Sequence, residues 1–304
     1  MSLLHANRLF GGPLASVTDV VCRHHASPRG GEEVAGGHRV IVVRRGVFVM
    51  HRDGSRGERV VAEPVQAMLL NRGAPYRVSH PVEGGDECTS MDFAAGAAAD
   101  VVRAFDPAAA DRAEAPFSLV RAPVGAEAWL RLRALRRALL GGAAQALAVE
   151  EEALALLARV VHDGWRAHAT RRTLRAGTAR QRERLVEHTR EVLAGAPGRA
   201  HTLASLARQV HASPFHLTRT FREAMGVPVH QYLLQLRLSL ALQRLDGGER
   251  MLSALALELG FSSHSHFTTA FRRHFGVTPS QVVRGVRPAD EAGRAVVAQP
   301  SIRG

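Results

Sequence analysis

The sequence predicts an α+β protein of several domains: an N-terminal β-rich part, a pair of helices, and an all-α C-terminal part. Three observations support this prediction. Short β-prone runs separated by Gly, Pro and Asn fill the first 93 residues. Apolar residues recur with helical spacing between residues 126 and 168. The last third of the chain then repeats one small helical unit at an offset of 49 to 50 positions. A chain of 304 residues is long enough for two or more such domains.

The N-terminal part, residues 1–115, is predicted to be a small barrel or sandwich, because it contains many short strands at close spacing. A small barrel can also hold a ligand among its inward side chains. The predicted strands are residues 17–22, 39–43, 46–50, 59–62, 65–70, 76–79 and 88–93.

Residues 116–170 are predicted to be a helical pair. Trp129, Leu132 and Leu135 lie on the apolar stripe of the first helix, and Leu157 and Val161 on that of the second. Two interpretations are open: the pair packs on the β domain, or it forms a dimer interface. A linker is expected at residues 169–184, and the tail at 289–304 is expected to be disordered.

The repeated unit of the C-terminal part, residues 171–288, consists of a short apolar-faced helix, a turn and a second helix. Thr202 is a predicted N-cap, and Ser213 followed by Pro214 begins the second helix. Gly226 and Gly276 stand where the second helix of each copy should end. This is the pattern of a helix-turn-helix, whose second helix enters the DNA major groove. Two such units could reach groove segments about 34 Å apart.

The distribution of charge agrees with DNA binding. All 40 basic residues are arginine. Residues 1–115 hold 13 arginines against 14 acidic residues, whereas residues 171–288 hold 18 against 7, a balance of +11. An excess of positive charge that coincides with the repeat is typical of a nucleic-acid-binding surface. For individual residues, especially those from Arg180 to Arg190, a solvated helix face is the alternative.

Residues 202–286 resemble the AraC/XylS family of bacterial transcription regulators. The resemblance is carried by Leu255-Ala-Leu-Glu-Leu-Gly-Phe261-Ser-Ser-His-Ser265-His-Phe267 and by Phe275-Gly-Val-Thr-Pro279. It implies two helix-turn-helix units joined by one long helix. The order of the N-terminal strands resembles the cupin-like sensor domain found in many such regulators.

The resemblance also implies which residues contact DNA. Thr269 stands where the family often has an arginine, so the second unit is expected to contribute less sequence information than the first. The implied contact residues are Phe215, Thr218, Arg219 and Arg222 in the first unit, and His264, Ser265, His266, Thr268, Thr269 and Arg272 in the second.

The expected function is a cytoplasmic transcription regulator, associated with the nucleoid when bound, and not an enzyme. Its expected partners are double-stranded DNA, a small effector in the N-terminal domain, a second copy of the chain, and RNA polymerase if it is an activator. Two cysteines indicate a reducing compartment, and the sequence has no apolar run long enough for a membrane span and no signal-peptide pattern at its start.

Cys22 and Cys88 fall on two predicted strands whose antiparallel pairing would bring them together. His80 is the histidine nearest in sequence to Cys88, so the three residues are a candidate zinc site. His24, His25 and His38 are also available. The alternatives are two buried thiols or a redox-switched disulfide.

Two alternative functions follow from these residues. A metal or thiol-redox sensing regulator would use Cys22 and Cys88. A cupin enzyme with a DNA-binding tail would need a metal-binding triad. The sequence has no intact triad and only a partial match to one, in His24-His25 with Glu32-Glu33.

Overall fold

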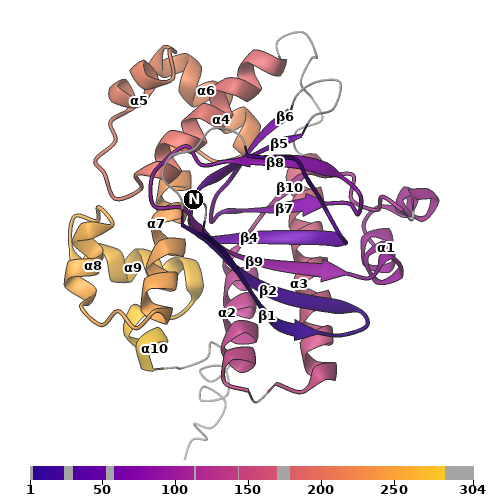
Figure 1. Cartoon of the computed structure of the whole chain (residues 1–304). Helices are drawn as coiled ribbons and strands as arrows, with labels where there is room; N and C mark the ends of the chain where they lie inside the picture. Colours follow the sequence, from indigo (N-terminus) through magenta and orange to yellow (C-terminus); the bar gives the residue numbers. More distant parts are fainter. Residues whose placement is uncertain are drawn as a thin grey trace, which may run out of the picture. The chain divides into compact units, whose positions relative to one another are not determined.

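The structure, a computed structural model, describes residues 3–23, 30–52, 58–112, 114–142, 144–169 and 179–284 (Figure 1). Its contacts divide the chain into two units. The first contains Met1–Pro197 and His201–Leu236, and the second contains Gly198–Ala200 and the chain from Arg237 onward. The predicted domain boundary at residues 170 and 171 and the predicted tail at 289–304 lie outside the described residues.

The first unit begins with two antiparallel sheets. Every predicted strand is present, so the expectation of a β sandwich or barrel is confirmed; its cupin-like character stays a prediction. The six-stranded sheet has the order β1 (Leu3–Gly11), β2 (Ala15–Arg23), β9 (Asp86–Phe93), β4 (His38–Gly46), β7 (Gln66–Leu70) and β10 (Arg121–Pro123). The four-stranded sheet has the order β3 (Glu33–Val34), β8 (Pro75–Ser79), β5 (Phe48–Arg52) and β6 (Glu58–Ala62).

Apolar side chains fill a core shared by the two sheets. Phe48 and Met50 from the smaller sheet pack with Val43, Met68 and Leu70 from the larger one, and all five are buried. Strand β2 alternates buried and half-buried residues over most of its length, as expected for a strand with one face on a core. The sandwich is therefore a packed scaffold.

Helices α2 (Ala126–Leu140) and α3 (Ala146–Ala169) lie side by side along one face of the larger sheet (Figure 1). Trp129 is buried and its indole nitrogen donates to the carbonyl of Pro64 at 3.0 Å. The predicted helical segment 116–170 therefore packs on the β domain, and it begins with strand β10 before the helices start. The remaining elements of this region are α1 (Ala95–Arg103) and the 3₁₀ helix η1 (Pro107–Arg112).

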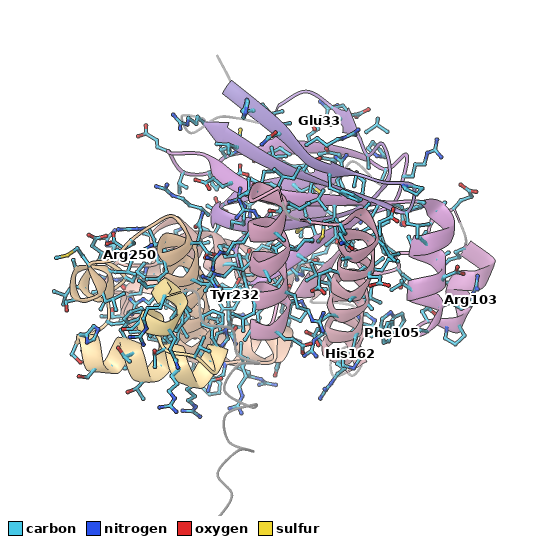
Figure 2. All side chains as sticks on the ribbon, turned by 90° about the horizontal axis from the view of Figure 1, so that it is seen from below. Glu33, Arg103, Phe105, His162, Tyr232 and Arg250 are labelled. Carbon is cyan, nitrogen blue, oxygen red and sulfur yellow. The ribbon has the colours of Figure 1, made fainter. Side chains whose placement is uncertain are left out.

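Phe105 and His162 fix the outer edge of this layer. Their rings lie 5.7 Å apart and face one another between the end of α1 and α3 (Figure 2). An aromatic contact of this kind adds to the burial of apolar surface and holds the two helices in register.

The C-terminal part is entirely helical, as predicted. Helix α7 runs from the first unit into the second and joins the two repeats. No helix among the described ranges is both long and apolar enough to cross a membrane. The helices are α4 (Ala179–Gly195), α5 (Leu203–Gln209), α6 (Pro214–Met225), α7 (Val229–Asp246), α8 (Leu252–Glu258), α9 (His264–Phe275) and α10 (Pro279–Arg284).

The linker predicted at residues 169–184 is wrong for its last part, because α4 already begins at Ala179. Leu185, Val186 and Leu193 are spaced for one helix face and are buried. They share a core with Val47, Val49, Val61 and Val65 of the β domain. Helix α4 is therefore held by the sandwich rather than being a free connection.

Arg190 is completely buried in this shared core, so the alternative of a solvated helix face is wrong for this residue. Its guanidinium donates to both carboxylate oxygens of Glu63 at 2.7 Å, to those of Glu187 at 2.7 and 2.9 Å, and to the carbonyl of Val61 at 2.8 Å. Its Nε donates to the hydroxyl of Tyr232 at 3.1 Å, and that hydroxyl donates to Glu63. Arg121 of β10 also donates to Glu187. We call Arg121, Arg190, Glu63, Glu187 and Tyr232 the arginine network.

The charges of the arginine network balance one another. Burial would raise the pKa of Glu187, but the positive charges of Arg121 and Arg190 and a hydrogen bond from the amide of Val61 lower it to about 2. Burial raises the pKa of Glu63, and Arg190 opposes that shift. Two carboxylates and two guanidinium groups thus compensate each other where water is excluded, which is the condition for burying charge at tolerable cost.

Removing Arg190 should therefore be costly. We expect Arg190→Ala to lower the free energy of unfolding by about 3–5 kcal/mol, because it leaves two buried carboxylates without their partner. Arg59→Ala is the matched control. Arg59 of β6 also pairs with an acidic residue of α4, Glu191, but it is partly exposed, so its loss should cost about 0–1 kcal/mol. Denaturant unfolding of both variants measures the difference. Equal losses of unfolding free energy in the two variants would show that the arginine network contributes no more to stability than an exposed ion pair.

Candidate nucleic-acid interface

The first helix-turn-helix is formed by α5 and α6, and its local signals act as predicted. The hydroxyl of Thr202 accepts from the amide of Ser205 at 3.1 Å and the reciprocal bond is also 3.1 Å, which makes a capping box. Ser213 caps α6 by accepting from the amide of His216 at 3.2 Å. Gly226 ends α6 in the left-handed conformation, with a φ of 76°.

The second helix-turn-helix is formed by α8 and α9 and repeats this design. Ser263 accepts from the amide of His266 at 3.1 Å, and Gly276 ends α9 with a φ of 76°. Phe267 and Phe271 are fully buried at the positions that Leu217 and Phe221 occupy in α6. Each second helix therefore buries one stripe and leaves its opposite face available.

The exposed face of α6 carries the residues predicted to contact DNA in the first unit. Phe215 is 75 % exposed, and Arg219 and Arg222 are also exposed. Thr218 is half-buried, and its hydroxyl donates back to the carbonyls of Pro214 and Phe215. Phe215 and the two arginines are therefore the predicted contact residues of α6 that are exposed.

Arg219 forms an ion pair in the absence of DNA. Its Nε donates to a carboxylate oxygen of Glu223 at 2.8 Å, one turn along the same helix. Hydrogen bonding to Glu223 raises the pKa of Arg219 and lowers the pKa of Glu223. Arg219 must exchange this carboxylate for a base or phosphate when DNA binds, so Glu223 orients the side chain and also competes for it.

In the second unit, His264, Ser265, His266, Thr269 and Arg272 are exposed on α9. The imidazole Nδ1 of His266 lies 3.0 Å from the hydroxyl of Ser262, which fixes the ring near the start of the helix. Thr268 is half-buried, and its hydroxyl is buried without a hydrogen-bond partner among the described residues. Thr269 and Arg272 line a surface hollow beside α9, together with Thr268, Arg273, Gly276 and Thr278.

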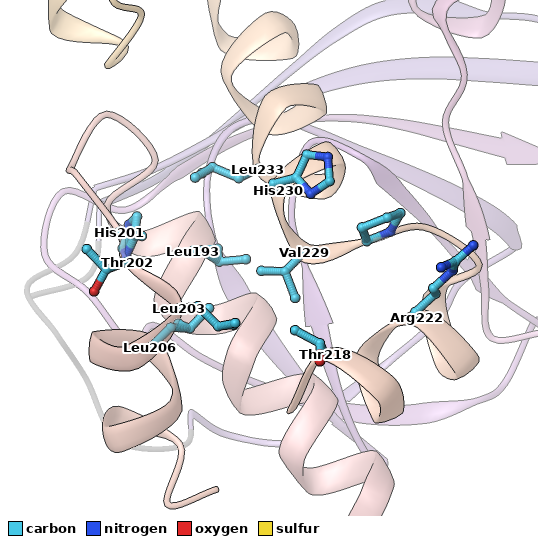
Figure 3. Close-up of a pocket in the computed structure, with 11 residues that line it drawn as sticks. Leu193, His201, Thr202, Leu203, Leu206, Thr218, Arg222, Val229, His230 and Leu233 are labelled. Atoms are coloured by element: carbon cyan, nitrogen blue, oxygen red, sulfur yellow. The ribbon is translucent and has the colours of Figure 1, made fainter. Parts of the chain in front are cut away.

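The first unit also contains a hollow of about 310 Å³, shown in Figure 3. Its floor is apolar and is formed by α4, α5 and the start of α7. Thr218 and Arg222 of α6 lie at its edge, so it borders the face predicted to bind DNA (Figure 3). The apolar lining residues are Leu193, Leu203, Leu206, Pro228, Val229 and Leu233, and the polar ones are His201, Thr202, Thr218, Arg222 and His230.

The residues predicted to bind metal lie in the β domain, away from these helices in sequence. Strands β2 and β9 pair antiparallel, as predicted, with Cys22 opposite Asp86 and Val20 opposite Cys88. Cys22 and His80 come together with Asp86, which the sequence did not single out. His38 is buried at the other end of β4, opposite Phe93, and His24 and His25 lie outside the described residues.

Comparisons with known proteins agree with this geometry. A family model described as a helix-turn-helix domain matches residues 206–285. Over 104 residues the chain is 34 % identical to the transcriptional activator RhaR of Enterobacter sp. strain 638, a stretch that covers 34 % of this chain and 37 % of RhaR. Residues 206–285 are therefore a helix-turn-helix domain, similar to that of AraC-type transcription regulators such as RhaR.

Solved structures with a similar arrangement include the C-terminal domain of the response regulator AraT from Geobacillus stearothermophilus. It is 26 % identical to the chain over 33 % of this chain and 84 % of that one, with a TM-score of 0.32. The match to ToxT from Vibrio cholerae covers 89 % of this chain and 96 % of the ToxT chain, at 10 % identity and with a TM-score of 0.33. The chain spans little more than a third of the length of the curated relatives that it matches.

Within the AraC-type domain, Arg219 and Arg222 should have different effects on DNA binding. We expect Arg219→Ala to lower sequence discrimination at one position by roughly tenfold or more, because one bidentate contact to a base supplies that much. Arg222→Ala should weaken binding to all sequences alike and reduce its salt dependence, as expected for a phosphate contact.

Binding to a randomised DNA library at two salt concentrations separates these effects. Equal loss of sequence preference in both variants would contradict the assignment. Glu223→Gln is a control with the opposite expected effect on DNA affinity. It should strengthen binding, because it releases Arg219 and removes a negative charge from the face predicted to bind DNA.

Proposed function

We propose that the whole chain is a sequence-specific, DNA-binding regulator of transcription whose two recognition helices, α6 and α9, read adjacent major-groove segments. The observation that carries this proposal is the repeated unit itself: both copies have a serine cap, a buried stripe, an exposed polar face and a left-handed glycine stop. The name of RhaR supports activation as the direction of regulation, which would make RNA polymerase a partner.

This proposal predicts a defined set of bound sequences. Purified full-length protein should enrich, from fragmented genomic DNA of its source, fragments that share two short elements separated by about one helical turn, about 10–10.5 base pairs. Sequencing the retained fragments identifies those elements. Retention of unrelated fragments with no shared element would reject sequence-specific binding while leaving non-specific DNA binding intact.

We further propose that the β domain controls the first helix-turn-helix. The core of that unit is shared with Val47, Val49, Val61 and Val65 of the sandwich, and the arginine network lies inside this shared core. A ligand that changes the β domain would therefore change the packing of α4 and α7. A ligand can shift DNA affinity only if it interacts differently with the two arrangements, and a shared core is a direct means for such a difference.

We propose a homodimer in which the exposed end of the helical pair forms the contact. Leu140 and Leu147 flank the α2–α3 turn and are 59 % and 69 % exposed. The double variant Leu140→Ser, Leu147→Ser should shift the protein to monomer and weaken binding to a two-element site, because a dimer raises the effective concentration of its second contact. Leu4→Ser, at a similarly exposed leucine of β1, is the control.

Sedimentation velocity reports the oligomeric state of these variants, and titration with DNA reports their affinity. A wild-type protein that stays monomeric at micromolar concentration and on its DNA site would exclude the dimer. It would leave the DNA-reading proposal unchanged.

A further inference from the structure

We propose that Cys22, His80, Asp86 and Cys88 form a binding site for a thiophilic divalent cation, with zinc as the best fit, and that this site acts on the first helix-turn-helix through the segment between His80 and Asp86. The metal site is independent of DNA reading. Its action on the helices rests on the proposed function.

The four side chains converge in the interior of the β domain. The ligand atoms of Cys22, His80 and Asp86 all lie within 4.8 Å of one another. The Sγ of Cys88 donates to Oδ2 of Asp86 at 2.8 Å, and Nε2 of His80 lies 2.8 Å from Oδ1 of the same carboxylate. All four residues are at most 7 % exposed.

The strand register explains why these residues meet. Cys22 stands directly opposite Asp86, so their side chains lie on the same face of the sheet. Cys88 is two residues further along β9 and therefore also lies on that face. His80 approaches from the segment that precedes β9. The cluster is thus fixed by backbone pairing on one side and closed by a single segment on the other.

The donor set matches zinc better than other common ions. Two thiols and an imidazole are the ligands typical of tetrahedral zinc, and a carboxylate is an accepted fourth ligand. Calcium and magnesium prefer sites made only of oxygen atoms. Zinc-ligand bonds of about 2.0–2.3 Å place tetrahedral ligand atoms about 3.3–3.8 Å apart, so the ligand atoms of Cys22, His80 and Asp86, all within 4.8 Å of one another, need only small side-chain shifts to bind the ion.

Electrostatics favours a cation in the same place. The Asp86 carboxylate accepts from the Cys88 thiol and lies beside the His80 imidazole, so a carboxylate is buried at the centre of the cluster. A divalent cation supplies the positive charge that this cluster of acidic groups needs, and it binds the thiols in their deprotonated form.

A disulfide between the two cysteines fits the geometry less well. Cys22 and Cys88 are diagonal neighbours across the β2–β9 pair, and such positions are about 7–8 Å apart. A disulfide needs Cα atoms about 4.4–6.8 Å apart, and no disulfide joins the two residues. A metal ion bridges the longer gap without moving the strands.

The segment between His80 and Asp86 links the cluster to the helices. Val82 packs against the core that the sandwich shares with the first helix-turn-helix. It lies directly over Gly195 of α4, where an added Cβ would approach Cγ1 of Val82 to 2.8 Å. A cation that draws His80 and Asp86 together therefore acts on a segment whose middle already touches α4.

The C-terminal end of this segment packs closely against β4. Gly84 and Gly85 have φ values of 102° and 71°, a conformation that only glycine adopts readily. At Gly46, which pairs with Asp86, an added Cβ would meet the carbonyl oxygen of Gly85 at 2.2 Å. This close approach limits movement of Gly85 toward β4.

The first experiment measures metal binding by the full-length protein. Elemental analysis of protein purified without added metal should give about one equivalent of zinc. Cobalt added to the chelated protein should produce the intense visible bands of a tetrahedral, thiolate-containing site. Cys88→Ser and Asp86→Asn should lose the metal, whereas His38→Gln, at a buried histidine of the opposite end of β4, should retain it.

Wild-type protein tests the site even where a variant fails to fold. Less than a tenth of an equivalent of zinc, with no cobalt bands and an unchanged melting temperature in chelator, would overturn the metal site. Recovery of a Cys22–Cys88 disulfide from protein that binds no metal when reduced would overturn it as well.

The second experiment measures DNA affinity with zinc and after chelation, using a site selected from genomic DNA. We expect a change in Kd of fivefold or more, which is the usual range for coupled sites. Val82→Ala should keep the metal but reduce that change, because it removes the contact with Gly195. Metal binding with equal DNA affinity in both states would overturn the coupling and keep the site. Absence of specific DNA binding in either state would overturn the proposed function alone.

Discussion

The burial of one guanidinium determines how the first unit of this protein is built. Arg190 is inaccessible to solvent, so each of its donors needs an acceptor inside the protein. Those acceptors come from three separate parts of the chain: Glu63 and Val61 from the sandwich, Glu187 from α4 and Tyr232 from α7. If any of these parts moved away, a charge would be left without compensation in a medium where that is expensive. Separating the sandwich, α4 or the start of α7 from the others would therefore leave Arg190 without part of its compensation.

Because of this constraint the two helix-turn-helix units have different surroundings, although their sequences are repeats of one pattern. The core of the first unit includes valines of the β domain and the ring of Tyr232, which lies 5.2 Å from that of Phe221. The second unit has an aromatic core of its own, in which Phe261, Phe267, Phe271 and Phe275 contact one another in sequence. A change in the sandwich would reach the first recognition helix by direct packing. The inequality also agrees with the chemistry of the two reading faces, since Arg219 has no arginine counterpart at Thr269.

Features that depend on local chemistry could be predicted from the sequence, and features that depend on long-range pairing could not. The cap at Ser213 and the stops at Gly226 and Gly276 follow from a few neighbouring residues, and the structure has them as predicted. The strands with β-branched residues were predicted as well, whereas β1 was missed because its mixed, largely exposed sequence has no clear alternation. Arg190 was misjudged because it stands in an arginine-rich stretch, and only Glu63, 127 positions away, shows that it is buried. Asp86 was missed because its role depends on the register of β2 against β9. The DNA contacts themselves stay predictions.

The two buried polar clusters of the β domain differ in a way that suggests a division of labour. The arginine network is complete, because both guanidinium groups and both carboxylates have opposite charges at hydrogen-bond distance. It has no need of a ligand and is suited to holding the sandwich and the helices together permanently. The cluster of Cys22, His80, Asp86 and Cys88 consists of acidic groups and one imidazole, so a cation changes its energy far more than it changes that of the arginine network. Val82 and Glu63 both lie on the sandwich side of the same shared core. A permanent link and a variable one at a single interface would suit the control that we propose, because a cation at the variable cluster would adjust the helices while the arginine network keeps them attached.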